Sequence, residues 1–381
     1  MSIDRQLFVD KLKRFMSQLQ VDIYDLSEGT GIHEDRLQEL MFLQDDPSGD
    51  EVLIFSDYFK CDYHFFISNQ KYAIFERTEN FYRVYGDELS SQDRFAIQEF
   101  IYLCECEDLL MKEIGLYNKS DEFFFVKKGW DKRKQGHEAA AELRRHLDIG
   151  THDIPDVFNI FRKLNLHIFR RKLAKSSISG LHIRHPEIGK CILVNYDEDL
   201  YRQRFTVAHE VGHSILDDNQ DDSIQYEKYS KEDLSETRAN NFASHLLLPP
   251  QMLRGLPNPM AWSREIFIDY ANRLQVNAQT LAIGLYEVNK IDELTKQEFS
   301  YYRLPREIKQ DQELKRLSTA GKKRMEGLLQ RGLSDGYVEL CFQAYDDRKI
   351  SLGKLTEMLL SNSVEIASIF KLYNRAMGHG D

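Results

Sequence analysis

The sequence lacks an apolar run long enough to cross a membrane, which needs roughly eighteen or more apolar residues. Its first residues, MSIDRQLFVDKLKRF, contain no apolar signal core followed by a small-residue cleavage site, so we expect no secretion. Basic charge is also in deficit, because 51 Lys and Arg stand against 62 Asp and Glu for a net charge of −11. This balance argues against a general polyanion-binding protein, since contacts with phosphate need clustered lysine and arginine. We therefore expect a cytoplasmic, globular protein.

Cysteine is scarce and is not spaced for metal binding. The five cysteines are an odd number and include no Cys-x-x-Cys pair. Cys104 and Cys106 lie two positions apart in a predicted helix, a spacing that points their side chains to different faces. This usage is typical of a reducing compartment and indicates thiols without a disulfide or metal role.

The chain is too long for one ordinary core, so its 381 residues indicate several domains. No internal repeat is visible, and changes of hydrophobic pattern therefore have to mark the boundaries. They predict a helical domain at 1–70, a helical connector at 71–125, a mixed α and β domain at 126–290, and a helical C-terminal domain at 291–381. The predicted fold class is α+β.

Three short segments of the mixed domain are predicted to be strands, at 166–171, 179–185 and 190–196. A long predicted helix follows them. The second strand, SGLHIRH, is a candidate edge at which an extended peptide could add as an extra strand.

The stretch RFTVAHEVGHSILDD, residues 204–218, places two histidines and a glutamate within five positions of that helix. His209 and His213 lie one turn apart on the same face, and Glu210 projects from the neighbouring edge. A peptidase zinc needs three protein ligands, an open position for water and a general base beside that water. With twelve histidines in the chain, a chance His-Glu-x-x-His occurs on the order of a few per cent of the time. The motif alone therefore does not establish a zinc site.

A second helical stretch, SETRANNFASHLLLPP, supplies what the first motif lacks. Glu236 opens that stretch, and Asn240 lies one turn further on the same face. A carboxylate ligand, together with an amide that holds a histidine ring in the correct tautomer, is what such a zinc site requires. We therefore predict that His209, His213 and Glu236 hold Zn²⁺ and that Glu210 is the base.

These two motifs, with GLHIR and CILVN upstream, make the chain resemble the ImmA/IrrE family of zinc metallopeptidases. The second motif matches the Glu-x-x-Ala-Asn, Phe-Ala and Leu-Leu-x-Pro signature of that family. The resemblance implies a zincin-like α/β metallopeptidase domain with a gluzincin-like site. It also implies a bacterial endopeptidase that cleaves a repressor or antitoxin in a stress, mobile-element or phage-defence response.

Two positions depart from the family pattern. His245 stands where the family usually has Glu, and Asp217 stands where a His often follows the active helix. His245 comes nine residues after Glu236, about 180° around an ideal helix, so we do not expect it to face the same metal. The group that stabilises the oxyanion stays open among Tyr226, Tyr229 and His245.

The N-terminal segment LSEGTGIHEDRLQELMFLQDDPSGDEVLIFSDYF resembles the XRE-type helix-turn-helix domain. The rival function is therefore a DNA-binding regulator or antitoxin whose zinc domain is a sensor or scaffold. A third alternative is a peptidase that has lost its activity.

Charge decides how we interpret this N-terminal domain. Residues 1–70 contain 6 Lys and Arg and 14 Asp and Glu, a net of −8. The presumed recognition helix begins with Glu34, Asp35 and Arg36. In the major groove its carboxylates could accept hydrogen bonds only from cytosine amino groups. We favour a protein partner over DNA, either a helix-turn-helix repressor or antitoxin or a second copy of this chain.

Overall fold

The computed structural model describes residues 3–68, 89–116, 123–174, 178–217, 234–315 and 317–376. Within these ranges no helix is both long enough and apolar enough to cross a membrane. Three short 3₁₀ turns (Pro259–Ala261, Arg306–Ile308 and Gln312–Leu314) join some of the longer elements. The helices and strands are α1 (Arg5–Leu19), α2 (Ile23–Thr30), α3 (Glu34–Met41), α4 (Gly49–Phe59), α5 (His64–Ile67), α7 (Ser91–Glu113), α8 (Lys132–His146), α9 (Val157–Arg162), β1 (His167–Arg171), β2 (Gly180–His185), β3 (Gly189–Asn195), α10 (Leu200–Leu216), α11 (Leu234–Leu247), α12 (Pro250–Arg254), α13 (Arg264–Arg273), α14 (Ala278–Glu287), α15 (Glu293–Ser300), α16 (Thr319–Gln330), α17 (Asp335–Asp346), α18 (Leu352–Met358) and α19 (Glu365–Leu372).

Helices α1 to α5 form a small helical unit, which we call the head (residues 3–68). Its core is rich in phenylalanine, with Phe15 stacked on Phe59 at 4.7 Å between ring centroids. Capping boxes at the starts of α2 and α4 fix where these helices begin. Gly31 ends α2 with a φ of 71°, a conformation that glycine adopts without steric cost, and thereby sets the turn into α3.

The three predicted strands are confirmed and form one sheet in the order β1-β3-β2. β1 pairs with β3 in parallel, whereas β2 pairs with β3 antiparallel. β3 is therefore central, and β2 is an edge strand of this sheet. The mixed arrangement of helices and a small sheet agrees with the predicted α+β class.

The two faces of the sheet are buried against different helices. Ile168, Ile192 and Val194 face the core shared with α8, α10 and α11. Phe169, Ile183 and Leu193 face the opposite way, into a core shared with α7 and with α16 to α19. This alternation follows from the period of two along each strand.

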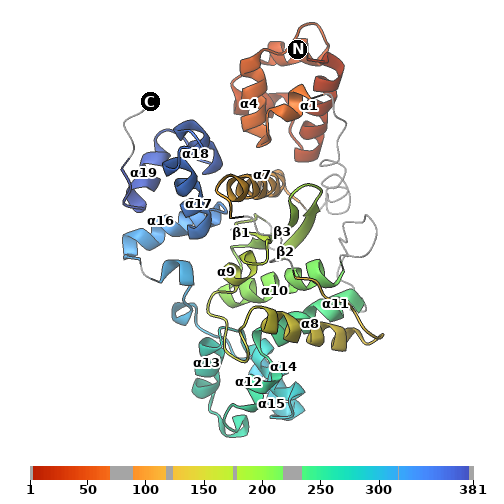
Figure 1. Cartoon of the computed structure of the whole chain (residues 1–381), viewed down its shortest axis with the longest axis vertical. Coiled ribbons are helices and arrows are strands. Elements are labelled where there is room, and N and C mark those ends of the chain that lie inside the picture. Colours follow the sequence, from red (N-terminus) through yellow and green to blue (C-terminus); the bar gives the residue numbers. More distant parts are fainter. Residues whose placement is uncertain are drawn as a thin grey trace.

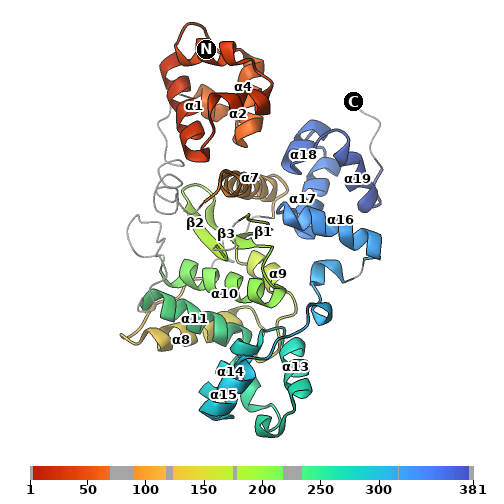
Figure 2. The same ribbon diagram turned by 180° about the vertical axis from the view of Figure 1, so that it is seen from behind.

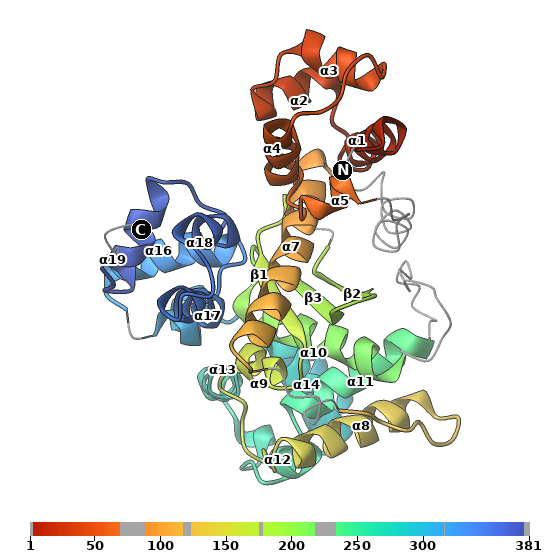
Figure 3. The ribbon, with the colours of Figure 1, turned by 45° about the horizontal axis from the view of Figure 1, so that its top comes forward.

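Helix α7 lies between the head and the sheet, with the C-terminal helices α16 to α19 beside it (Figures 1 and 2). With the top of the molecule tilted forward, α7 runs lengthwise from the head across the sheet (Figure 3). The head is tied to the start of α7 by Ser91, which donates to the carbonyl of Leu19, and by Gln98, which donates to the carbonyl of Lys60. The core beneath α7 also includes side chains from the sheet and from the C-terminal helices. The predicted domain boundaries stay predictions.

Candidate metal centre

Three buried side chains from α10 and α11 converge on one point. The Nε2 atoms of His209 and His213 lie 3.0 Å apart. Glu236 places Oε1 2.9 Å from His213 Nε2 and Oε2 3.3 Å from His209 Nε2. Among the described residues this is the group of histidine, cysteine and acidic side chains whose donor atoms gather closely enough to hold a metal ion.

The donor set fits a zinc ion. Tetrahedral zinc, with ligands at roughly 2.0–2.1 Å, separates neighbouring ligand atoms by about 3.3 Å, close to the three distances found here. Glu236 Oε2 is buried without a hydrogen-bond partner, which leaves a lone pair available to a cation. Burial alone would raise the pKa of Glu236, but the two neighbouring imidazoles lower it to about 2, so the carboxylate is ionised at neutral pH.

Both histidine rings contact an oxygen acceptor through Nδ1, on the side of the ring away from the metal position. His209 Nδ1 lies 3.1 Å from Asn240 Oδ1, and His213 Nδ1 lies 2.9 Å from Asp217 Oδ2. If each Nδ1–H donates to its oxygen acceptor, both Nε2 lone pairs face the metal position. Asn240 thus contacts a candidate ligand.

The contact of Asp217 with His213 was not predicted from the sequence, where Asp217 was noted only as a departure from the family pattern. Asp217 also forms a buried ion pair with Arg238 of α11, which in turn donates to Gln135 Oε1 of α8 at 3.2 Å. A signal was present in the sequence, since Asp217 follows His213 by one helical turn.

Glu210 follows His209 on α10, is itself buried, and interacts electrostatically with both candidate histidine ligands. Its Oε2 is 3.3 Å from Nδ1 of His182, a residue of β2 that the sequence did not single out. Burial would raise the pKa of Glu210, but the hydrogen bond with His182 and the neighbouring His209 and His213 bring it below the ordinary value. The carboxylate is therefore ionised at neutral pH, as a general base requires.

Of the three candidate oxyanion contacts, the structure describes His245. Tyr226 and Tyr229 lie outside the described residues. His245 stacks on His137 at 4.2 Å between ring centroids and lines a cavity of about 190 Å³ with residues of α12 and α14. Burial lowers the pKa of both of these histidines.

The head residues singled out from the sequence lie at the start of α3. Asp35 is exposed and Glu34 is partly buried. Arg36 is bound by three carboxylates, at 2.7 Å from Glu51, 2.7 Å from Asp45 and 3.1 Å from Glu39. These hydrogen bonds raise the pKa of Arg36 and occupy its guanidinium group within the head.

The part of the chain that holds this centre is similar to known metallopeptidases. Residues 161–286, which contain the sheet, α10 and α11, match the peptidase family described as the IrrE N-terminal-like domain. The chain is 32% identical over 127 residues to "Metallopeptidase ImmA" of Bacillus subtilis, a match that covers 32% of this chain and 73% of that protein. It is 33% identical over 100 residues to "Radiation response metalloprotease IrrE" of Deinococcus radiodurans, covering 25% of this chain and 30% of that protein.

Proposed function

Because the chain belongs to the IrrE N-terminal-like family of metallopeptidases, we propose that it is a zinc-dependent endopeptidase. One observation carries the proposal: two histidine Nε2 atoms and the Glu236 carboxylate converge beside a second buried carboxylate, Glu210. A structural zinc site has no need of a free carboxylate next to its ligands, whereas a hydrolytic site does. We further propose that the sheet, α10 and α11 constitute a zincin-like domain.

In the proposed mechanism, His209, His213 and Glu236 would hold a zinc ion, which would act as a Lewis acid that brings the pKa of a water molecule toward neutrality and polarises the scissile carbonyl. Glu210 takes a proton from the attacking water and later passes it to the leaving amine. Asn240 and Asp217 hold the two imidazole rings in place. A substrate that adds to the edge of β2 would pass close to Glu210, because His182 of this strand contacts that carboxylate.

We propose a repressor or antitoxin protein as the substrate, cleaved in a bacterium to switch on a stress, mobile-element or phage-defence response. The names of the two relatives support a metallopeptidase and, for one of them, a response to radiation. The resemblance in the sequence motifs supports the class of substrate.

The experiment that tests the proposal compares new protein N-termini in host cells that express the natural protein or Glu210→Gln. The substitution keeps the shape of the side chain and removes the base, so we expect equal zinc content in the two purified proteins. New termini in one repressor-like protein, found only with the natural protein, would identify the substrate. If the two sets of termini are identical under conditions that trigger the response, the peptidase assignment fails.

We propose that the head is a helix-turn-helix unit, with α2 and α3 as its pair, that binds a protein rather than DNA. Gly31 in the turn between the helices supports the first part. The engaged Arg36 and the net charge of −8 support the second. Several apolar side chains of the head are exposed, which suits a protein partner: Tyr24, Phe42 and Leu53.

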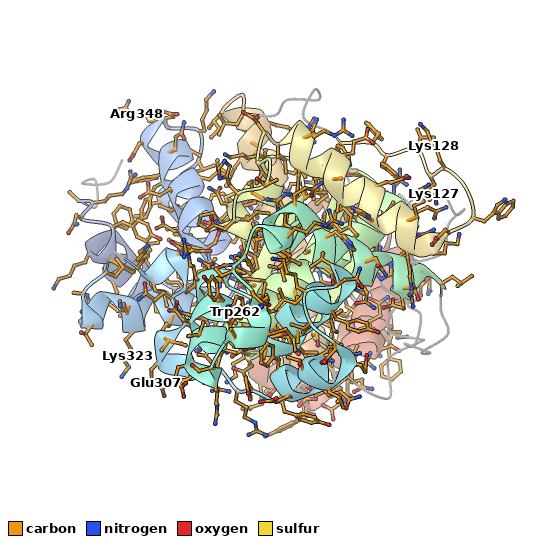
Figure 4. The ribbon with its side chains drawn as sticks, turned by 90° about the horizontal axis from the view of Figure 1, so that it is seen from below. Lys127, Lys128, Trp262, Glu307, Lys323 and Arg348 are labelled. Carbon is orange, nitrogen blue, oxygen red and sulfur yellow. The ribbon has the colours of Figure 1, made fainter. Side chains whose placement is uncertain are left out.

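The rival function, a DNA-binding regulator, would need basic surface from elsewhere in the chain. Lys323 of α16 lies on the opposite side of the molecule from Lys127 and Lys128, so these lysines do not form one surface (Figure 4). Binding of the full chain to duplex DNA that weakens steeply with added salt would nevertheless favour the rival.

A further inference from the structure

His182 is the one feature of this centre contributed by the edge strand β2. Its neighbours Leu181 and Ile183 point into the core beneath α7, so the alternation of the strand turns His182 toward α10. Gly180 lies on the same side of the strand, and a Cβ there would lie 2.5 Å from Thr206 Cγ2 and 3.3 Å from Glu210 Cγ. The strand therefore lies tightly against the helix at the level of Glu210.

The contact between His182 and Glu210 joins an accessible ring to a buried carboxylate. The His182 side chain is 23% exposed and the Glu210 side chain is 5% exposed. Because an ionised carboxylate only accepts hydrogen bonds, Nδ1–H of His182 is the donor to Oε2. The imidazole lies parallel to the His213 ring, at 5.8 Å between centroids and with 10° between the planes.

A carboxylate without a fixed partner rotates about its last side-chain bond, since that torsion has a broad energy profile. A hydrogen bond to one oxygen restricts the plane of the group and therefore the direction of the other oxygen. A general base depends on such a direction, because it must lie within hydrogen-bond reach of the proton that it takes.

We propose that His182 is a positioning residue for Glu210. Its Nδ1–H binds Oε2, so that Oε1 is the oxygen that takes the proton from the attacking water. This inference rests on the proposed peptidase function and adds a residue from a separate element of the fold to it. His182 holds no metal in this proposal, since it lies outside the group formed by His209, His213 and Glu236.

Three substitutions separate this role from its alternatives. His182→Asn keeps an N–H donor near the place of Nδ1, His182→Gln moves the donor to the place of Nε2, and His182→Leu removes it. Each purified protein is loaded with zinc and analysed for zinc content, for kcat and KM on the substrate identified from the new N-termini, and for inhibition by acetohydroxamate. Acetohydroxamate chelates the metal and transfers its hydroxyl proton to a carboxylate beside it.

We expect all four proteins to bind the same amount of zinc. The kcat of the Leu and Gln variants falls by about 10- to 100-fold with little change in KM, whereas the Asn variant retains most of the natural kcat. A Leu variant as active as the natural protein would overturn the proposal. Recovery of kcat by the Gln variant and not by the Asn variant would also overturn it, because His182 would then act through Nε2 on the substrate. Loss of zinc from the Leu variant would overturn it as well.

Inhibitor binding keeps this inference distinct from the peptidase assignment. If the natural protein cleaves no substrate, the proposed function fails, but acetohydroxamate still reports on the direction of the Glu210 carboxylate. We expect the natural protein and the Asn variant to bind it about tenfold more tightly than the Leu and Gln variants, since a misdirected base loses a charge-assisted hydrogen bond. Equal affinities in all four proteins would overturn the positioning role.

Discussion

At the scale of single residues, Asn240 offers a direct test of how the histidine ligands are oriented. It is exposed, so its replacement leaves the core intact, yet its Oδ1 lies 3.1 Å from His209 Nδ1. We expect Asn240→Leu to weaken zinc binding by about 10- to 100-fold, because the ring loses its acceptor. Competition with a chromophoric chelator measures the change. Asn240→Asp retains an acceptor and is the matched control, and equal affinity in the Leu variant and the natural protein would contradict the role.

The residues of the centre divide according to how far apart they lie in the sequence. His209, Glu210 and His213 follow from helical spacing within five positions, and Asn240 follows from the same spacing after Glu236. His182 could not be predicted in this way, because its contact joins a strand to a helix 28 residues away. Arg238 was also missed, since periodicity cannot show that a buried arginine pairs with a carboxylate on another helix.

At the scale of elements, the packing of α8 against α11 depends on Gly136. A Cβ there would lie 2.3 Å from the carbonyl oxygen of Arg238 and 2.9 Å from the amide nitrogen of Phe242, so the α11 backbone would have to move. We expect Gly136→Ala to lower the free energy of unfolding by at least about 2 kcal/mol and to weaken zinc binding, because Glu236 lies on α11. Denaturant unfolding measures the first effect.

Gly327→Ala in α16 is the control for this substitution, because nothing lies within 4 Å of its added Cβ. There the gain in helix propensity should stabilise the protein by up to about 1 kcal/mol. If both substitutions behave alike, close approach of α8 and α11 is not what requires glycine at position 136.

The contact between α7 and β1 should make stability depend on pH. His167 Nδ1 lies 2.8 Å from Glu107 Oε2, and both side chains are buried. Burial lowers the pKa of His167, but the hydrogen bond and charge of Glu107 more than compensate and raise it to about 9. Since this exceeds the unfolded value of about 6.5, the charged pair stabilises the fold fully below that pH.

The stabilisation, on the order of 3 kcal/mol, is lost as the pH rises through 9. Denaturant unfolding at pH 6 and pH 10 should therefore show a larger difference for the natural protein than for His167→Gln. The prediction fails if the two proteins lose equal stability between these pH values.

The sequence predicted the helices and strands better than it predicted which of them pack together. Short apolar segments located all three strands, but the order β1-β3-β2 and the parallel pairing of β1 with β3 depend on contacts that the sequence pattern does not contain. Helix α7 was correctly predicted as a helix. Its position across the sheet was not, because an amphipathic pattern shows which face is buried and not what buries it.

At the scale of the whole molecule, the core beneath α7 joins parts of the chain that are far apart in sequence. Phe100 and Leu103 of α7 pack with the sheet and with the C-terminal helices, and Phe169 of β1 contacts Tyr337 of α17 at 5.4 Å between ring centroids. The sheet face that carries Phe169, Ile183 and Leu193 therefore depends on both flanking segments to exclude water.

We accordingly expect a fragment of residues 126–290, the predicted peptidase domain, to be unstable by itself. It contains the whole candidate metal centre but exposes the apolar sheet face that α7 and α16 to α19 cover. A fragment of residues 89–381 removes the head and keeps that core, and it should unfold cooperatively and bind zinc as the full chain does. Thermal unfolding and binding of a hydrophobic dye compare the two fragments. A monomeric 126–290 fragment that unfolds cooperatively without dye binding would mean that the sheet needs neither neighbour.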